Sequence, residues 1–138
     1  ICLGFAMGKT GATRWLVDIT LLGSIQSPFV LIMMISLVAI FLTEAISNTA
    51  VVALLMPITI GLTIDFSIDP VITTLAVAVP SGLAFILPMG TPAVAIAYSS
   101  GFIKPGDAFK GGIILKIAAW MLFNIFAYFY WPILGLGL

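Results

Sequence analysis

The chain contains 138 residues, of which 62% are hydrophobic and 7% are charged, with five basic and five acidic side chains. A soluble domain carries about 25% charged residues, so this composition predicts an integral membrane protein. The formal net charge of zero argues against nucleic-acid binding, which depends on a basic surface. The chain has no His and one Cys, so we expect neither an enzyme nor a bound cofactor.

Residues 1–27 are predicted to form short helical segments that join two parts of a larger protein. Short apolar stretches alternate there with Lys9, Arg14 and Asp18. The chain begins with Ile1 and lacks the basic segment and the cleavage motif of a signal peptide. We therefore interpret it as the interior of a longer polypeptide.

Residues 28–64 are predicted to form a re-entrant helical hairpin. Two apolar stretches, 29–42 and 50–64, flank the polar sequence TEAISNT at positions 43–49. Each stretch covers only about 21 to 23 Å as a helix, less than the roughly 30 Å of hydrocarbon in a bilayer. A single helix over the whole region is the alternative, and Pro57 disfavours it. A polar tip in lipid must be enclosed by protein or line an aqueous cavity.

Residues 70–103 are predicted to form a discontinuous transmembrane helix. No charged residue occurs from 71 to 103, and the sequence PMGTP lies at positions 88–92. Two prolines and a glycine disfavour regular helix there, although a packing kink in an ordinary span remains an alternative. After a polar loop at 104–110, residues 111–138 are predicted to form a final full span, in which Asn124 would make an interhelical hydrogen bond.

Basic residues mark the cytoplasmic side of a membrane protein. Lys104, Lys110 and Lys116 therefore place the loop 104–110 in the cytoplasm and the C-terminus outside. The acidic stretch 65–69 has no basic neighbour and is predicted to lie outside as well. The hairpin would then enter from the outside of an energised membrane, which we expect to be the plasma (inner) membrane.

The two polar breaks have the chemistry of an ion site. The helix predicted to begin at Ala50, directly after Asn48 and Thr49, presents unpaired amides and the positive end of its dipole, which suit an anion. The preceding helix ends in free carbonyls, which suit a hard cation such as sodium. Gly90 and Thr91 offer the same groups at the second break. A coupled cation and anion carrier is the economical interpretation, and a simple helix cap at 47–49 is the alternative.

Several motifs of the chain occur in the same order in one group of carriers. They are T-E-x-x-S-N-T-A at 43–50, L-P-M-G-T-P at 87–92 and S-G-F at 100–102, after a G-K-x-G-x-x-x-W-L opening at 8–16. With them the chain resembles the second half of the divalent anion/sodium symporter family, whose members carry dicarboxylates, citrate or sulfate. Many carboxylate carriers of that family continue Thr-Pro with Pro-Asn, whereas this chain continues with Ala-Val at 93–94.

The resemblance implies a set of site residues and an assembly. It places sodium at Thr43, Ile46, Asn48 and Gly90, and the substrate carboxylate at Asn48, Thr49, Thr91 and Pro92. It also implies an all-α membrane fold that is one inverted-repeat half of an elevator-type homodimer, whose N-terminal repeat is missing from these residues.

We therefore expect the C-terminal repeat of a secondary active transporter. It would couple sodium to uptake of a small divalent anion, with a dicarboxylate favoured, by alternating access in the lipid bilayer. A proton-coupled or exchange-type carrier that uses Glu44 is one alternative, and a non-transporting structural membrane subunit is another. Intramembrane acids are commonly functional, but we favour a structural role for Glu44, bonded to backbone amides of the tip.

Overall fold

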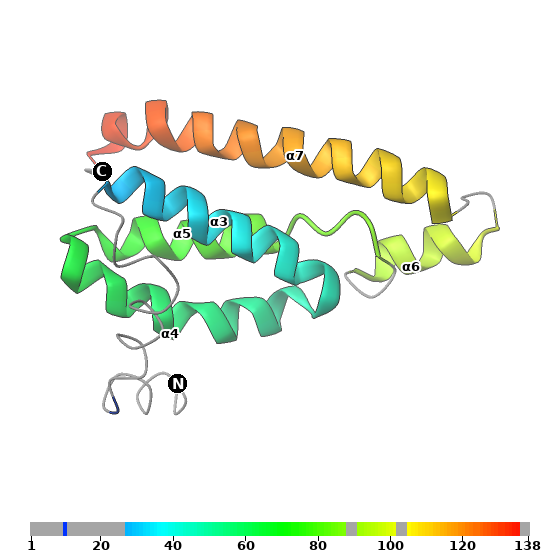
Figure 1. The fold of residues 1–138 in the computed structure, drawn as a ribbon, viewed down its shortest axis with the longest axis horizontal. Coiled ribbons are helices and arrows are strands. Elements are labelled where there is room, and N and C mark those ends of the chain that lie inside the picture. The colour runs from blue at the N-terminus through cyan, green and yellow to red at the C-terminus, as the bar shows by residue number, and fades with distance from the viewer. Residues whose placement is uncertain (1–9, 11–26, 88–90, 102–104, 136–138) are drawn as a thin grey trace.

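The computed structural model describes residue 10 and residues 27–87, 91–101 and 105–135, except the side chains of 62–66 and 105. All helices and turns in this part of the chain are shown in Figure 1, and its regular elements are helical. The expected all-α class is confirmed. The predicted short helices at 1–27 lie outside the described residues, apart from Thr10 and Ser27.

Two long helices occupy the region of the predicted hairpin. Helix α3 spans Pro28–Ala45 and helix α4 spans Asn48–Phe66, with 18 and 19 residues. At 1.5 Å per residue they are about 27 and 28 Å long, longer than the sequence predicts. The difference arises because α3 continues through the polar residues 43–45 and ends only where Ile46 becomes extended. Ser47 then caps α4, because its Oγ accepts a hydrogen bond of 3.3 Å from the amide of Ala50.

Helix α5, Pro70–Ser81, packs against both α3 and α4. Asp69 caps the start of α5, because its Oδ1 accepts a hydrogen bond of 2.8 Å from the amide of Val71. Aspartate at this position followed by proline is a favoured helix start. These three helices and two residues farther along the chain, Ala127 and Trp131, enclose an apolar core. Its other members are Leu31, Ile32, Ile35, Ala39, Val51, Leu55, Ile68, Ile72, Ala76 and Val77.

The second break begins earlier than the sequence predicts. Helix α5 ends at Ser81, and residues 82–87 have no helical structure; we call them the unwound segment. Helix α6, Pro92–Ser99, follows with Thr91 as its cap. The helix therefore breaks from Gly82 onward, before the proline-rich stretch, of which 88–90 lie outside the described residues.

Helix α7 spans Pro105–Tyr130 and is followed by a short 3-10 turn, η2, at Pro132–Leu134. The predicted loop at 104–110 is therefore wrong for 105–110, which form the first turns of α7. Proline is well tolerated at the first helical position because its missing amide hydrogen has no partner there. The helix is about 39 Å long by its 26 residues.

Helix α7 runs back along α3 in the opposite direction (Figure 1). The register is fixed by a contact between the rings of Phe29 and Tyr128 at 5.1 Å and by a hydrogen bond of 3.1 Å from Trp120 Nε1 to Ser36 Oγ. Farther along, Lys116 meets Glu44, one residue before α3 ends. The first part of α7, residues 105–115, therefore extends about 16 Å beyond the end of α3.

Beyond its first turns, which carry the exposed Asp107 and Lys110, the exposed surface of α7 is apolar. Pro28–Ala45 and Gly106–Leu134 are the described segments long and apolar enough to cross a bilayer. On α7, Ile114, Leu122 and Phe129 are each about two-thirds exposed (70%, 69% and 66%). A soluble protein would bury such side chains, so the helix is suited to lipid or to further protein within a membrane.

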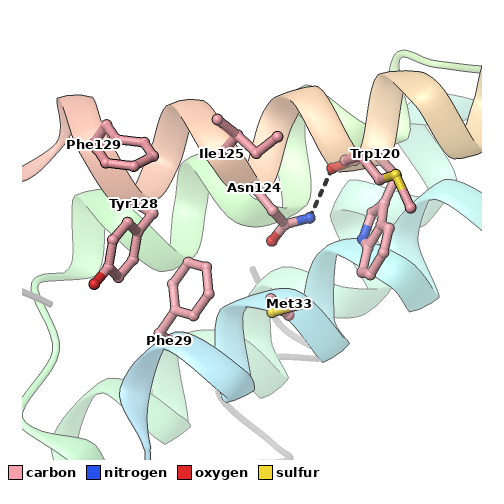
Figure 2. A pocket seen from close by; sticks show the side chains of 8 residues that line it. Phe29, Met33, Trp120, Asn124, Ile125, Tyr128 and Phe129 are labelled. Carbon is pink, nitrogen blue, oxygen red and sulfur yellow. Dashed lines mark hydrogen bonds between the residues drawn. The ribbon is translucent and has the colours of Figure 1, made fainter.

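Figure 2 shows an apolar pocket between α3 and α7 that contains one amide side chain. Asn124 is buried, and its Nδ2 donates a 2.8 Å hydrogen bond to the carbonyl of Trp120 in its own helix. Its Oδ1 has no partner among the described residues. The interhelical hydrogen bond expected of Asn124 is thus absent there, and Trp120 makes one to Ser36 instead.

Candidate ion and substrate site

Three oxygen atoms from three helix ends meet at Thr43. Its Oγ1 lies 2.6 Å from Asn48 Oδ1 and 2.6 Å from the carbonyl oxygen of Ser81. Thr43 is fully buried, and Ser81 is the last residue of α5. A hydroxyl has one proton, so it can donate to only one of the two oxygens at a time.

The surplus of acceptors at Thr43 suits a small hard cation. Neutral oxygens and the free carbonyls at the end of a half-helix are the ligands that transporters use for sodium. Turning the Asn48 amide would instead direct Nδ2 at the hydroxyl and satisfy the cluster without an ion. With Asn48 Oδ1 facing Thr43, as in this structure, the cluster can hold a cation without any acidic ligand.

The predicted sodium ligands are partly brought together. Thr43 and Asn48 are in contact, whereas Ile46 forms the extended link between α3 and α4, and Gly90 lies outside the described residues. The sequence did not indicate Ser81, because its contribution is a backbone carbonyl. The only local signal for it is the neighbouring Pro80 and Gly82, which favour the end of a helix.

The predicted substrate residues lie at two helix N-termini. Thr49 is an exposed residue in the first turn of α4, and Pro92 is the exposed first residue of α6. Thr91 caps α6, because its Oγ1 accepts a hydrogen bond of 3.4 Å from the amide of Val94. No hydrogen bond between described residues joins Thr49 to Thr91 or Pro92, so the two N-termini are candidate anion-binding groups that the described hydrogen bonds do not connect.

Glu44 binds the unwound segment. Its Oε1 accepts hydrogen bonds from the amides of Phe85 and Ile86 at 3.0 and 3.2 Å. Its Oε2 accepts from the amides of Ile86 and Leu87 at 3.2 and 2.7 Å. One carboxylate therefore satisfies three consecutive backbone amides.

Lys116 neutralises this carboxylate. Its Nζ lies 2.6 Å from Glu44 Oε1 and also donates to the carbonyl of Ile40. Only 1% of Lys116 is exposed. The use of Lys116 as a cytoplasmic marker is therefore wrong, because a buried, paired lysine carries no information on orientation. Lys110, and Lys104 outside the described residues, are the remaining basic markers near the start of α7.

Two further contacts hold the same segment. The hydroxyl of Tyr98 on α6 donates a hydrogen bond of 2.9 Å to the carbonyl of Ile86. Gly112 on α7 lies so close that a Cβ there would be 2.7 Å from Ile86 Cγ1 and 3.3 Å from the carbonyl oxygen of Phe85. The unwound segment is thus fixed by α3, α6 and α7 together.

Comparison with known proteins gives a family and several relatives. Residues 1–137 match the family described as the sodium:sulfate symporter transmembrane region. The chain is 36% identical over 132 residues to an uncharacterised transporter of Methanocaldococcus jannaschii, covering 94% of this chain and 30% of that protein. It is 28% identical over 137 residues to the sodium-dependent dicarboxylate transporter SdcS of Staphylococcus saprophyticus, covering 99% and 26%. It is 34% identical over 119 residues to human solute carrier family 13 member 2, covering 83% and 20%.

The chain spans about a fifth to a third of the length of these relatives. The match nevertheless includes nearly all of this chain, with both polar breaks and the helices that flank them. It confirms the resemblance to the divalent anion/sodium symporters seen in the motifs. The chain belongs to the sodium:sulfate symporter family of membrane transporters.

Proposed function

We propose that this chain is the C-terminal repeat of a secondary active transporter that couples sodium to uptake of a small divalent anion. A dicarboxylate is the favoured substrate, since matched relatives are named a sodium-dependent dicarboxylate transporter and a Na⁺/citrate cotransporter. The observation that carries the proposal is the oxygen cluster at Thr43. A first, inverted repeat of the complete polypeptide would supply the other half of the site.

The sodium ion occupies the cluster of Thr43, Asn48 and the Ser81 carbonyl in this proposal, with the carbonyls of Ile46 and Gly90 completing its shell. All of these ligands are neutral. Thr43 and Ser81 lie in the last turns of α3 and α5, so the ion also meets the negative ends of two helix dipoles. Such ligands bind sodium well when water is excluded.

The anion is bound by the N-termini of α4 and α6. Asn48 and Thr49 belong to the first, and Thr91 and Pro92 to the second. Without sodium an incoming carboxylate would face free carbonyl oxygens of the same sign. A bound sodium ion offsets the partial negative charge of these carbonyl oxygens, and the positive ends of α4 and α6 then attract the anion. The cation therefore binds first and the anion follows.

The membrane arrangement we propose is a re-entrant hairpin beside a broken helix, within an elevator-type homodimer. Helix α3 ends at the level of Lys116, where the chain turns back into α4. Residues 105–115 of α7 extend beyond this level. A tip at that depth lies inside the bilayer if α7 spans it. The exposed Lys110 favours a cytoplasmic start of α7, with residues 65–69 and the C-terminus outside the plasma (inner) membrane.

The test is sodium-driven uptake by the complete carrier in proteoliposomes, with Thr43→Val compared to Thr59→Val. Both threonines are buried, but the hydroxyl of Thr59 only donates 3.1 Å to Met56 of its own helix. A contact to a charged group contributes about 1.5–3 kcal/mol, so Thr43→Val should raise the half-saturating sodium concentration about tenfold or more. Thr59→Val should leave it unchanged.

Three results would contradict the proposal. Equal dicarboxylate uptake without sodium would reject the coupling. A sodium-independent flux driven by pH and lost in Glu44→Gln would favour the proton-coupled alternative. Unchanged sodium dependence in Thr43→Val would remove the cluster from the site and leave the hairpin tip a structural contact.

A further inference from the structure

We propose that Glu44 and Lys116 form a neutral ion pair that positions the unwound segment and so sets the sodium affinity of the carrier, without exchanging protons. This inference rests on the proposed function for its sodium readout. Neither side chain is a ligand in it. Both act through the backbone that they hold.

The carboxylate of Glu44 replaces the hydrogen bonds that a continuous helix would make. If α5 continued, the amides of residues 85–87 would bond to the carbonyls of residues 81–83. Instead all three amides bond to Glu44, and the carbonyl of Ser81 is left to face Thr43. Unpaired amides are not tolerated within a bilayer, so the unwound state depends on this acid.

Lys116 makes this arrangement electrically neutral. Its ammonium group contacts residues of α3. It bonds to the Glu44 carboxylate and the Ile40 carbonyl and lies 5.4 Å from the centroid of the Phe41 ring. Within the described residues no other charged group contacts either partner. A carboxylate already engaged with an ammonium and three amides has no role left as a proton carrier.

Adjacent residues of α3 connect this pair to the oxygen cluster. Thr43 holds the carbonyl of Ser81, the residue just before the unwound segment, and Glu44 holds the amides of 85–87. Both lie in the last turn of α3, which ends at Ala45. Release of 85–87 would therefore let the Phe85 amide compete for the Ser81 carbonyl and would loosen the chain that leads to Thr91, so that the sodium ligands would lose their preorganised positions.

The test compares Glu44→Gln, Lys116→Met and the double variant in the complete carrier. Each single variant leaves one buried charge without its partner, and removal of one member of a buried pair is strongly destabilising. The double variant leaves no charge, so its folded yield should return close to that of the wild type. Glutamine offers one oxygen in place of two, so the double variant should still need about tenfold more sodium for half-maximal uptake. Asp107→Asn and Lys110→Met remove exposed charges from α7 and serve as controls.

A second readout does not depend on transport. Hydrogen exchange of the amides of 85–87 should accelerate about tenfold or more in the double variant, while amides of α4 keep their protection. A combination of restored folded yield and lower sodium affinity supports positioning, because a merely stabilising pair would change both together.

The outcomes separate this inference from the proposed function. Unchanged exchange at 85–87, or a double variant with wild-type sodium affinity, overturns the positioning role. Proton movement that accompanies wild-type uptake and disappears in Glu44→Gln overturns the claim that the pair exchanges no protons. Faster exchange in a carrier whose uptake ignores sodium overturns the proposed function and leaves the hold on the unwound segment intact.

Discussion

Two neighbouring glycines of α7 provide a sharp test of how tightly the unwound segment is held. At Gly112 a Cβ would lie 2.7 Å from Ile86 Cγ1 and 3.3 Å from both Ile86 Cα and the carbonyl oxygen of Phe85. At Gly111 a Cβ would meet nothing within 4 Å. Alanine at the two positions therefore differs only in what it touches.

The magnitudes follow from two opposing effects. Replacement of glycine by alanine within a helix is favourable by about 1 kcal/mol, and this gain is common to both variants. Gly112→Ala also forces atoms into a packed site, where overpacking costs about 1–3 kcal/mol. The side chain of Ile86 can rotate away, but Ile86 Cα and the Phe85 carbonyl belong to backbone held by Glu44. The unfolding free energies of the two variants should therefore differ by about 1–3 kcal/mol.

The assay is thermal unfolding of the purified complete carrier together with the sodium dependence of its uptake. Gly111→Ala should unfold at the wild-type temperature or slightly above it and keep its sodium affinity. Gly112→Ala should unfold at a lower temperature than Gly111→Ala and should need more sodium. If both variants are stabilised equally, the unwound segment does not rest on α7 and the reasoning fails.

Two further substitutions test individual polar contacts. Tyr98→Phe removes the hydrogen bond to the Ile86 carbonyl and should lower the unfolding free energy by about 0.5–1.5 kcal/mol. The control Tyr128→Phe, at an exposed position, should leave the unfolding free energy unchanged. Equal changes in the two variants would contradict the contact between Tyr98 and Ile86. Asn124→Leu removes a buried amide whose Oδ1 has no partner among the described residues, so thermal unfolding should show unchanged or higher stability. A loss above about 1 kcal/mol would mean that another part of the carrier binds this oxygen.

Helix starts were the part of the fold best marked by the sequence. Proline restricts its own backbone to helical angles and has no amide hydrogen to leave unpaired, so it suits the first turn. The described helices that begin at a proline are α3, α5, α6 and α7. The helix α4 begins at Asn48 after the Ser47 cap, which is the other common start. Each of these signals is local, which is why a single sequence contains them.

The position of the second break was not predictable in this way. Residues 83–87 read LAFIL, and leucine and alanine favour helix. The last three of them are held out of a helix because Glu44, far away in the chain, accepts the amide hydrogens of 85–87. The same long-range contact explains the error over Lys116, which local sequence presents as a surface charge. The one signal of this pair in the sequence is that Glu44 and Lys116 are each isolated in an apolar stretch.

The charge distribution around the oxygen cluster constrains the order of binding. Glu44 is the one charged side chain in α3, and Lys116 cancels it. The described candidate ligands, the Thr43 and Asn48 oxygens and the Ser81 carbonyl, are neutral. The described part of the proposed site is thus neutral, and a divalent anion bound there alone would bring two uncompensated negative charges into a medium of low dielectric. In the proposed transporter, sodium ions would supply the opposite charge, so neutral oxygens beside a cancelled ion pair favour coupled transport over transport of the anion alone.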